Sequence, residues 1–174
     1  MHQPSSTVYF ATLKHEDWEL RLAATDVGLC NILLPKEPFD SLEGWIKKSI
    51  PDARLIHSET KLQPYAKEIR EYFMGQRTAF FSPLDLRGTP FQVQVWRELL
   101  HIPFGQTRSY SEIATNIGRP RAVRAVGGAN GANPIPIIIP CHRVIGKNGT
   151  LTGYSGGLDI KTKLLNFEGY AQKA

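Results

Sequence analysis

The feature that most constrains the fold is a break in the hydrophobic patterning about halfway along the chain. Helical and strand-like periodicities both stop at residues 80–88, where the sequence reads FFSPLDLRG. Proline, aspartate and glycine in such a stretch are typical of a loop. With 174 residues, the chain has the length for one domain or two small ones. We therefore predict an N-terminal domain over residues 1–85 and a C-terminal domain over residues 86–174.

The first half has the pattern of a small antiparallel sheet with helices. Three strand-like segments and two helical ones follow one another, at residues 8–10, 18–24, 29–34, 40–50 and 62–73. Residues 26–28, Asp-Val-Gly, are typical of a tight turn between strands, and Gly75 is a stop signal for the second helix. The first half is therefore predicted to be α+β.

The second half is predicted to be mostly helical. A capping-box pattern, Thr89 to Gln92, starts one helix, and a second, Ser109 to Glu112, starts a short helix that stops at Gly118. A further helix is predicted from Arg121 to about Ala129, after Pro120. Two short helices joined by a turn with glycine fit a helix-turn-helix, although proteins that never touch DNA share that geometry.

The last of these helices is made almost entirely of small residues. Arg121 and Arg124 are its long side chains, and the rest are small: Ala122, Val123, Ala125, Val126, Gly127, Gly128 and Ala129. Such a helix could approach a nucleic-acid backbone or a groove floor closely. Alternatively, the small residues pack against a neighbouring helix.

Charge and composition limit the classes of binding partner that the protein could have. The formal net charge is +5 and the pI is about 9.3, which favours a polyanionic partner without requiring one. No apolar stretch is long enough to span a bilayer and the N-terminus lacks a secretory pattern, so we expect an intracellular protein and no membrane partner. The five histidines and two cysteines show no ligand spacing, so no metal is predicted.

Cys30 and Cys141 lie in very different sequence settings. They could form one disulfide, but free thiols are the better interpretation without a secretory signal. Cys30, on a predicted strand, is expected to be an inert core residue. Cys141 follows an isoleucine-rich run, which predicts a buried strand that delivers it to a site. Its neighbours His142 and Arg143 are expected to lower the pKa of the Cys141 thiol and favour the nucleophilic thiolate.

His142 would point to the opposite face of such a strand. A proton relay through water is therefore easier than direct contact with the Cys141 thiol.

The segment Pro140-Cys141-His142-Arg143-Val144 resembles the active-site signature of the O6-alkylguanine-DNA alkyltransferases. The resemblance runs from about Leu84 to Gly169, with order and spacing preserved. It rests on further segments: Ser109-Tyr110, Arg124-Ala125-Val126-Gly127-Gly128, Asn133-Pro134, Gly153-Tyr154-Ser155-Gly156-Gly157 and Glu168-Gly169. It implies an α+β protein with a ribonuclease-H-like N-terminal sheet and a winged-helix-like C-terminal domain containing the helix-turn-helix and the active cysteine.

The resemblance also implies a DNA-repair activity. A minor-groove helix-turn-helix would flip O6-alkylguanine out of double-stranded DNA, and Cys141 would take the alkyl group. A thioether offers no carbonyl for water to attack, so the protein should act once, without cofactor or metal. O4-alkylthymine is a second expected substrate. We expect a monomer in solution, cytoplasmic in a bacterium or archaeon and nuclear in a eukaryote, with cooperative binding along DNA left open.

The roles of single residues follow from the same resemblance. The implied catalytic residues are Cys141, His142, Glu168, Tyr110 and Ser155. The implied substrate-binding residues are Tyr154, Gly156, Val144 and Asn133. The implied DNA-binding residues are Arg124, Tyr110, Arg121, Ala125 and Gly127. Glu168 would hold His142, Arg124 would fill the space left by the flipped base, and Arg143 would brace the two domains.

Two other function classes compete with this one. A non-enzymatic regulator would use the helix-turn-helix to read base sequence, but the small helix has few side chains suited to major-groove edges. A thiol hydrolase would turn over repeatedly on small esters, whereas an alkyltransferase would stop after one equivalent.

Overall fold

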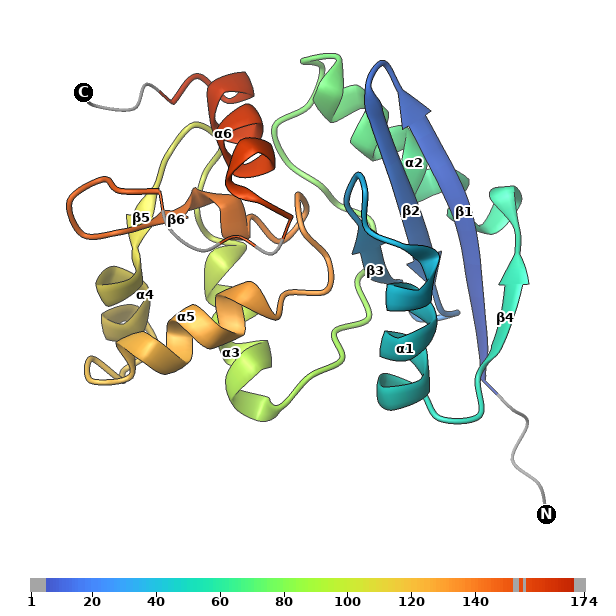
Figure 1. The fold of residues 1–174 in the computed structure, drawn as a ribbon, viewed down its shortest axis with the longest axis horizontal. Coiled ribbons are helices and arrows are strands. Elements are labelled where there is room, and N and C mark those ends of the chain that lie inside the picture. The colour runs from blue at the N-terminus through green and yellow to red at the C-terminus, as the bar shows by residue number, and fades with distance from the viewer. Residues whose placement is uncertain (1–5, 152–153, 155, 171–174) are drawn as a thin grey trace. The chain divides into compact units, whose positions relative to one another are not determined.

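The computed structural model describes residues 6–151, 154 and 156–170. The chain forms two compact units, one up to Arg87 and the other from Gly88 on (Figure 1). Within the described residues, no helix combines the length and the apolar character needed to cross a membrane.

The first unit is built on a four-stranded sheet with the order β3-β2-β1-β4. Its strands are β1 (Thr7–His15), β2 (Trp18–Ala24), β3 (Leu29–Leu33) and β4 (Arg54–His57). The first three strands are antiparallel, as predicted, whereas β4 pairs in parallel with β1 and was not predicted. The side chains of β4 are mostly exposed, so this strand shows none of the apolar alternation by which a half-buried strand is recognised.

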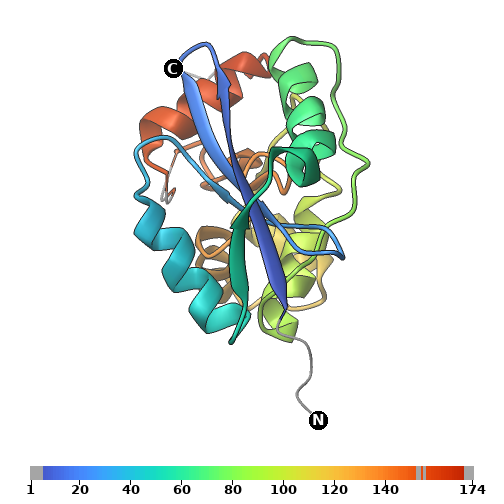
Figure 2. The ribbon, with the colours of Figure 1, turned by 90° about the vertical axis from the view of Figure 1, so that its right-hand side faces the viewer.

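Helices α1 (Phe39–Ser49) and α2 (Glu59–Phe73) lie on opposite faces of this sheet (Figure 2). Alternate residues of a strand point to opposite faces, so β1 serves both helices. On one face, α1 shares a buried apolar cluster with Val8 and Cys30. On the other face, α2 packs against β1 and β2, and Trp18 stacks on Phe73 with their ring centroids 4.8 Å apart. Cys30 is a free, fully buried thiol, which confirms the prediction of a core residue.

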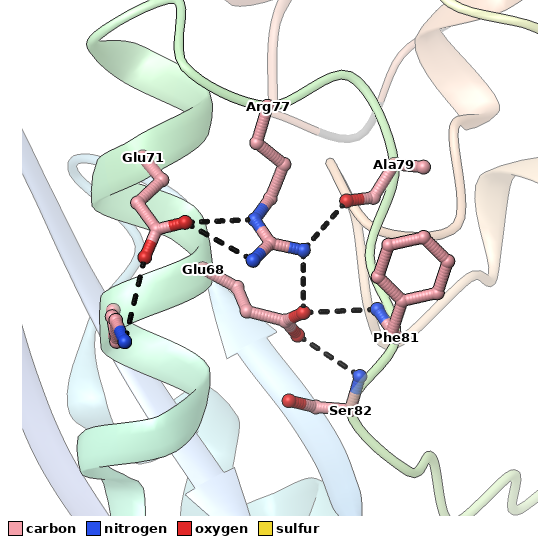
Figure 3. A network of polar contacts seen from close by, with 7 residues as sticks. Glu68, Glu71, Arg77, Ala79, Phe81 and Ser82 are labelled. Atoms are coloured by element: carbon pink, nitrogen blue, oxygen red, sulfur yellow. Dashed lines mark hydrogen bonds and ion pairs between the residues drawn. The ribbon is translucent and has the colours of Figure 1, made fainter.

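A buried carboxylate organises the irregular chain that follows α2 (Figure 3). Glu68 accepts hydrogen bonds from the backbone N–H groups of Phe81 at 2.9 Å and Ser82 at 3.0 Å. It also accepts one from Arg77 Nη1 at 2.8 Å, and Arg77 binds Glu71 through two further nitrogens. Burial favours a higher pKa for Glu68, but these hydrogen bonds and the Arg77 charge hold that pKa below its ordinary value. The network therefore fixes a segment that has no regular backbone pairing of its own.

The second unit is mostly helical. Its elements are α3 (Pro90–Leu99), β5 (Arg108–Ser109), α4 (Tyr110–Asn116), α5 (Val123–Gly131), η1 (Cys141–Arg143), β6 (Val144–Ile145) and α6 (Leu158–Phe167). Both predicted capping boxes are confirmed: Thr89 and Ser109 each cap a helix reciprocally with the residue three positions on. Helices α3, α4 and α5 pack on one another, and the Trp96 indole N–H donates to the Ala129 carbonyl at 2.8 Å.

Two predictions in this unit are wrong. Helix α5 starts at Val123 and not at Arg121, because residues 119–122 form a turn closed by the Ala122 N–H and the Arg119 carbonyl. The isoleucine-rich run before Cys141 is not a strand but a series of buried turns. Prolines at 134, 136 and 140 lack the N–H that a strand ladder needs. Ile137 has a φ of 76°, a left-handed conformation that is rare for a β-branched residue.

Candidate active site

Cys141 lies at the start of the short 3-10 helix η1, directly after Pro140. Its own N–H donates to the Ile139 carbonyl at 2.7 Å, and its carbonyl accepts the N–H of Val144, which closes the turn. The side chain is a free thiol in a residue that is only 2% exposed. The turn after the buried run, and not a strand, therefore presents the thiol.

Two asparagines from the end of α5 and just beyond it hold this turn. Asn133 accepts the Ile135 N–H at 2.9 Å and donates to the Ile139 carbonyl at 2.8 Å, so its amide bridges the start and the end of the loop. Asn130 donates to the Cys141 carbonyl at 3.4 Å. Asn133 was expected here from the resemblance. Asn130 was missed, because an asparagine inside a helical pattern carries no signal of what it contacts eleven residues later.

Behind Cys141, a buried polar cluster joins η1 to the end of α6. His142 Nε2 lies 2.8 Å from Glu168 Oε2. Arg143 donates to both oxygens of Glu168, at 2.7 and 2.9 Å, and to the Ile102 carbonyl at 2.7 Å. The structure thus brings His142 and Glu168 together, as expected, and adds Arg143 to the pair.

The protonation of this cluster follows from its burial and contacts. Burial favours a higher pKa for Glu168, but hydrogen bonds from His142 and Arg143, with their charges, hold that pKa far below its ordinary value. Burial lowers the pKa of His142 against the opposing effect of Glu168, so the ring is neutral at neutral pH. Its second nitrogen, Nδ1, is buried without a hydrogen-bond partner among the described residues.

The Cys141 thiol has a raised pKa, contrary to our expectation from its neighbours in the sequence. Burial raises it, while hydrogen bonding from Asn133, the charge of Lys161 and hydrogen bonding from Tyr154 lower it. The charges of His142 and Arg143 were expected to act, but His142 is neutral and Arg143 binds Glu168. Lys161, fully buried on α6, was missed, because a lysine in an amphipathic helix is ordinarily a surface residue.

The remaining residues assigned to the substrate lie around the same turn. Val144 is buried in β6, and its carbonyl accepts a hydrogen bond from Lys161 Nζ at 2.6 Å. Tyr154 is buried, and Gly156 lies in the turn that the Gly157 N–H closes on the Tyr154 carbonyl. Ser155, an expected catalytic residue, falls outside the described residues.

The residues assigned to DNA lie on α4, α5 and the turn between them. Tyr110 is the first residue of α4, and a Cβ placed on Gly127 would lie 4.0 Å from its Cδ1 atom. Arg121, Arg124 and Ala125 are exposed. On the opposite side of α5, Val126 and Ala129 are buried, so these two small residues pack inside the unit, and close approach of the exposed side to a nucleic acid stays a prediction.

Among the residues that the structure describes, no group of three or more histidine, cysteine, aspartate or glutamate side chains could hold a metal ion. The side chains gathered around Cys141 provide a buried thiol, a neutral imidazole oriented by a carboxylate, and nearby cationic and hydroxyl groups.

Comparison with known proteins identifies both halves of the chain. Residues 8–86 match the family described as 6-O-methylguanine DNA methyltransferase, ribonuclease-like domain, and residues 90–170 match the DNA binding domain of the same description. The inducible methylated-DNA–protein-cysteine methyltransferase of Bacillus subtilis strain 168 is 48% identical over 168 residues, covering 97% of this chain and 94% of that protein.

Solved structures agree with these sequence matches. The crystal structure of Mycobacterium tuberculosis O6-methylguanine methyltransferase is similar with a TM-score of 0.80 and 42% identity, covering 92% of each chain. Mycobacterium tuberculosis OGT in complex with DNA gives a TM-score of 0.79 and 41% identity, covering 93% of this chain and 92% of that one.

Proposed function

The chain belongs to the family of 6-O-methylguanine DNA methyltransferases, which are DNA-repair enzymes, and we propose that it transfers the alkyl group of O6-alkylguanine in DNA irreversibly to its own Cys141. The observation that carries this assignment of the nucleophile is the buried pair of His142 and Glu168 beside Cys141. Cys30, the other cysteine, lies in the apolar core of the first unit: burial raises the pKa of its thiol to about 12, Asp85 adds to that effect, and Arg87 acts against it.

In the proposed mechanism, His142 is the general base for the Cys141 thiol. Glu168 accepts the N–H of Nε2 and so fixes the tautomer in which Nδ1 can accept a proton. The lowered pKa of His142 keeps the ring neutral and able to act as a base. A water molecule at Nδ1 would carry the proton from sulfur, since that nitrogen has no partner among the described residues.

The exposed side of α5 would enter the minor groove of double-stranded DNA. Its small residues, Ala125 among them, would allow close approach, and Arg121 and Gly127 would lie at the backbone. Arg124 would occupy the space left by the flipped guanine and so offset the cost of unstacking, which is a few kcal/mol. Tyr110, at the start of α4, would crowd the phosphate during flipping and then donate to the purine.

The transfer step would take place in a pocket formed by the turn around Cys141. Tyr154, Gly156 and Val144 would surround the alkyl group, with Asn133 holding the loop. The thiolate attacks the alkyl carbon, a carbon–sulfur bond forms as the carbon–oxygen bond breaks, and guanine leaves, stabilised by Ser155 and Tyr110. The thiol proton ends on guanine, and the thioether cannot be hydrolysed.

Intact mass spectrometry after incubation with a duplex containing one O6-methylguanine tests the reaction and its nucleophile. We expect one methyl group on the wild-type protein and on a Cys30→Ala variant, and none on Cys141→Ala. A wild-type protein that binds this duplex but gains no mass would favour the regulator. Continuing turnover on small esters beyond one equivalent would favour the hydrolase. The same assay with O4-methylthymine tests the second substrate.

Base flipping is tested by comparing two substrates of the same reaction. Arg124→Ala should slow transfer from duplex DNA by about tenfold or more, since part of a cost of a few kcal/mol is no longer offset. Transfer from free O6-methylguanine, which needs no flipping, should not change. Arg97→Ala, which removes an exposed charge from α3, is the matched control. Equal losses on both substrates would contradict a role in flipping.

A further inference from the structure

The turn that joins α4 to α5 contains an arginine, Arg119, that the proposed mechanism does not use (Figure 1). It lies between Gly118 and Pro120, and its side chain is exposed. Together with Pro120, Arg121 and Ala122, it lines an open hollow in the surface of the second unit. A surface hollow with two arginine side chains favours an anionic ligand.

The backbone of Arg119 is held by the way α4 ends. Gly118 has a φ of 77°, and its N–H donates to the Thr115 carbonyl at 3.0 Å. The Arg119 N–H donates to the Ala114 carbonyl at 2.9 Å, which completes the pair of hydrogen bonds typical of a helix that ends at a glycine. The Arg119 carbonyl then accepts the Ala122 N–H at 2.9 Å, where the chain turns toward α5. Arg119 therefore has a fixed place in the turn.

Helix α3 positions the side chain of the same residue. The Arg119 guanidinium carbon lies 5.8 Å from the centre of the Phe91 ring, and Gln94 Nε2 donates to the Ile117 carbonyl at 3.3 Å. A guanidinium that stacks on an aromatic ring is restrained, but its N–H groups stay available as donors. With the residues that the structure describes, the Arg119 guanidinium forms no hydrogen bond or ion pair. Its donors are therefore both restrained and accessible to a ligand.

The distribution of charge along the chain indicates which anion the hollow favours. Residues 88–174 contain ten lysines and arginines against four aspartates and glutamates, whereas residues 1–87 contain eleven against twelve. Within the described part of the chain, no aspartate or glutamate forms an ion pair with Arg119 or Arg121. The excess positive charge thus belongs to the unit that contains the hollow, and it favours a polyanion such as the DNA backbone.

We propose that Arg119, restrained by Phe91, binds a phosphate of the DNA backbone and so fixes the position of α5 on the duplex. This role rests on the proposed function, which brings the exposed side of α5 to the DNA. Contacts to phosphates contribute affinity and set the position of a protein on the duplex, but they carry no information about the base. Arg119 therefore strengthens the binding of any duplex and takes no part in base flipping or in the attack by Cys141.

The salt dependence of binding tests this contact on undamaged duplex. Each phosphate contact adds about 0.9 to the slope of log affinity against log salt concentration, so one contact is worth roughly eightfold in affinity at 0.1 M relative to 1 M salt. Arg119→Ala should reduce the slope by about that amount. Arg70→Ala, which removes an exposed arginine from α2 of the first unit, is the matched control and should leave the slope unchanged. A wild-type slope in Arg119→Ala would overturn the proposal.

A change at Phe91 separates the charge of Arg119 from its placement. Phe91→Leu retains the charge, so the salt slope should stay at the wild-type value. Affinity for undamaged duplex should fall by about two- to fivefold, because the guanidinium is no longer restrained by an aromatic ring. An unchanged affinity in a folded Phe91→Leu variant would contradict the role given to the ring.

The transfer reaction distinguishes the role of Arg119 from that of Arg124. With saturating methylated duplex, Arg119→Ala should react at the wild-type rate, and only the DNA concentration that gives half the maximal rate should rise. A lower rate at saturation would refute a role confined to binding. If the wild type gains no methyl group, the proposed function fails, whereas the salt slope on undamaged duplex still decides whether Arg119 contacts a phosphate.

Discussion

Each unit of the molecule contains a buried glutamate bonded to an arginine, and the two glutamates differ in what else they bind. Glu68 in the first unit receives Arg77 and two backbone N–H groups, which lie in a loop without regular pairing (Figure 3). Glu168 in the second unit receives Arg143 twice and one nitrogen of the His142 ring. Both carboxyls have lowered pKa values, and both are charged at neutral pH.

The difference lies at the far end of each network. The Glu68 network ends in backbone amides that are fixed once the loop is folded, so it can only stabilise structure. The Glu168 network ends in an imidazole whose Nδ1 is buried with no partner among the described residues, beside a buried thiol. Buried polar groups are nearly always hydrogen-bonded, so a buried ring nitrogen without a partner suggests a role in the reaction. The same pair of residue types thus stabilises a loop in the first unit and, on our proposal, forms part of a proton relay in the second.

Glu168→Gln should produce the largest effect. It leaves Arg143 without its buried counter-charge, which typically costs about 3 to 5 kcal/mol of unfolding free energy, and it removes the group that sets the His142 tautomer. Transfer from methylated duplex should fall by at least about 100-fold. Urea unfolding and a single-turnover rate measure the two effects. A variant with a near wild-type transfer rate would show that Glu168, like Glu68, has only a structural role.

His142→Asn should separate chemistry from stability. The loss of a general base should reduce the transfer rate by about 100-fold to 10,000-fold. Arg143 keeps its hydrogen bonds to Glu168, so the stability loss should be smaller than in Glu168→Gln. Stopped-flow quench with labelled duplex gives the rate, and a loss of less than about tenfold would remove His142 from the mechanism.

Glu68→Gln is the matched change in the first unit. It should lower the unfolding free energy by about 1 to 3 kcal/mol, because Arg77 and one backbone N–H lose a charged acceptor in a site that is largely buried. The transfer rate of the folded variant should equal that of the wild type. A loss of transfer rate as large as in Glu168→Gln would contradict the conclusion that the Glu68 network only stabilises structure.

The smallest expected effect is a pH dependence of the contribution that Glu68 makes to the free energy of unfolding. The pKa of Glu68 in the folded protein lies below its ordinary value of 4.5, so folding favours the ionised form. The stabilisation is present above the unfolded pKa and is lost as pH falls through the folded pKa. The difference in unfolding free energy between the wild type and Glu68→Gln should thus be constant near neutral pH and shrink in acid. A difference that grows in acid would contradict the lowered pKa.

The parts of the fold that the sequence predicts are those with local signals. The capping boxes at Thr89 and Ser109 place two helix starts correctly, because the residues that cap a helix are three apart in the chain. Strands β5 and β6 were not predicted, because two-residue strands have no periodicity and pair only after the unit has folded. The run before Cys141 misleads for another reason: an apolar stretch shows that a segment is buried and not how its backbone runs.

The same contrast between local signals and packing applies to the active-site residues. A motif at fixed spacing identifies Cys141 and His142, and the resemblance adds Glu168. Asn130, Lys161 and the bonding of Arg143 to Glu168 depend on side chains that meet only through the packing of η1 on its neighbours. The sequence therefore predicts the residues at the site better than the charges around them, and the predicted lowering of the Cys141 pKa is wrong for that reason.

The hydrogen bond from the Asn130 side-chain amide to the Cys141 carbonyl joins the proposed DNA-binding helix to the nucleophile. Asn130 lies in the last turn of α5, the helix whose exposed side we assign to the DNA groove, and the Trp96 indole N–H donates to the carbonyl of the preceding residue, Ala129. If α5 contacts DNA as proposed, the Asn130 side chain connects that contact directly with the backbone of the nucleophile. We therefore expect a shift of α5 on DNA binding to reach the backbone of Cys141 through this hydrogen bond.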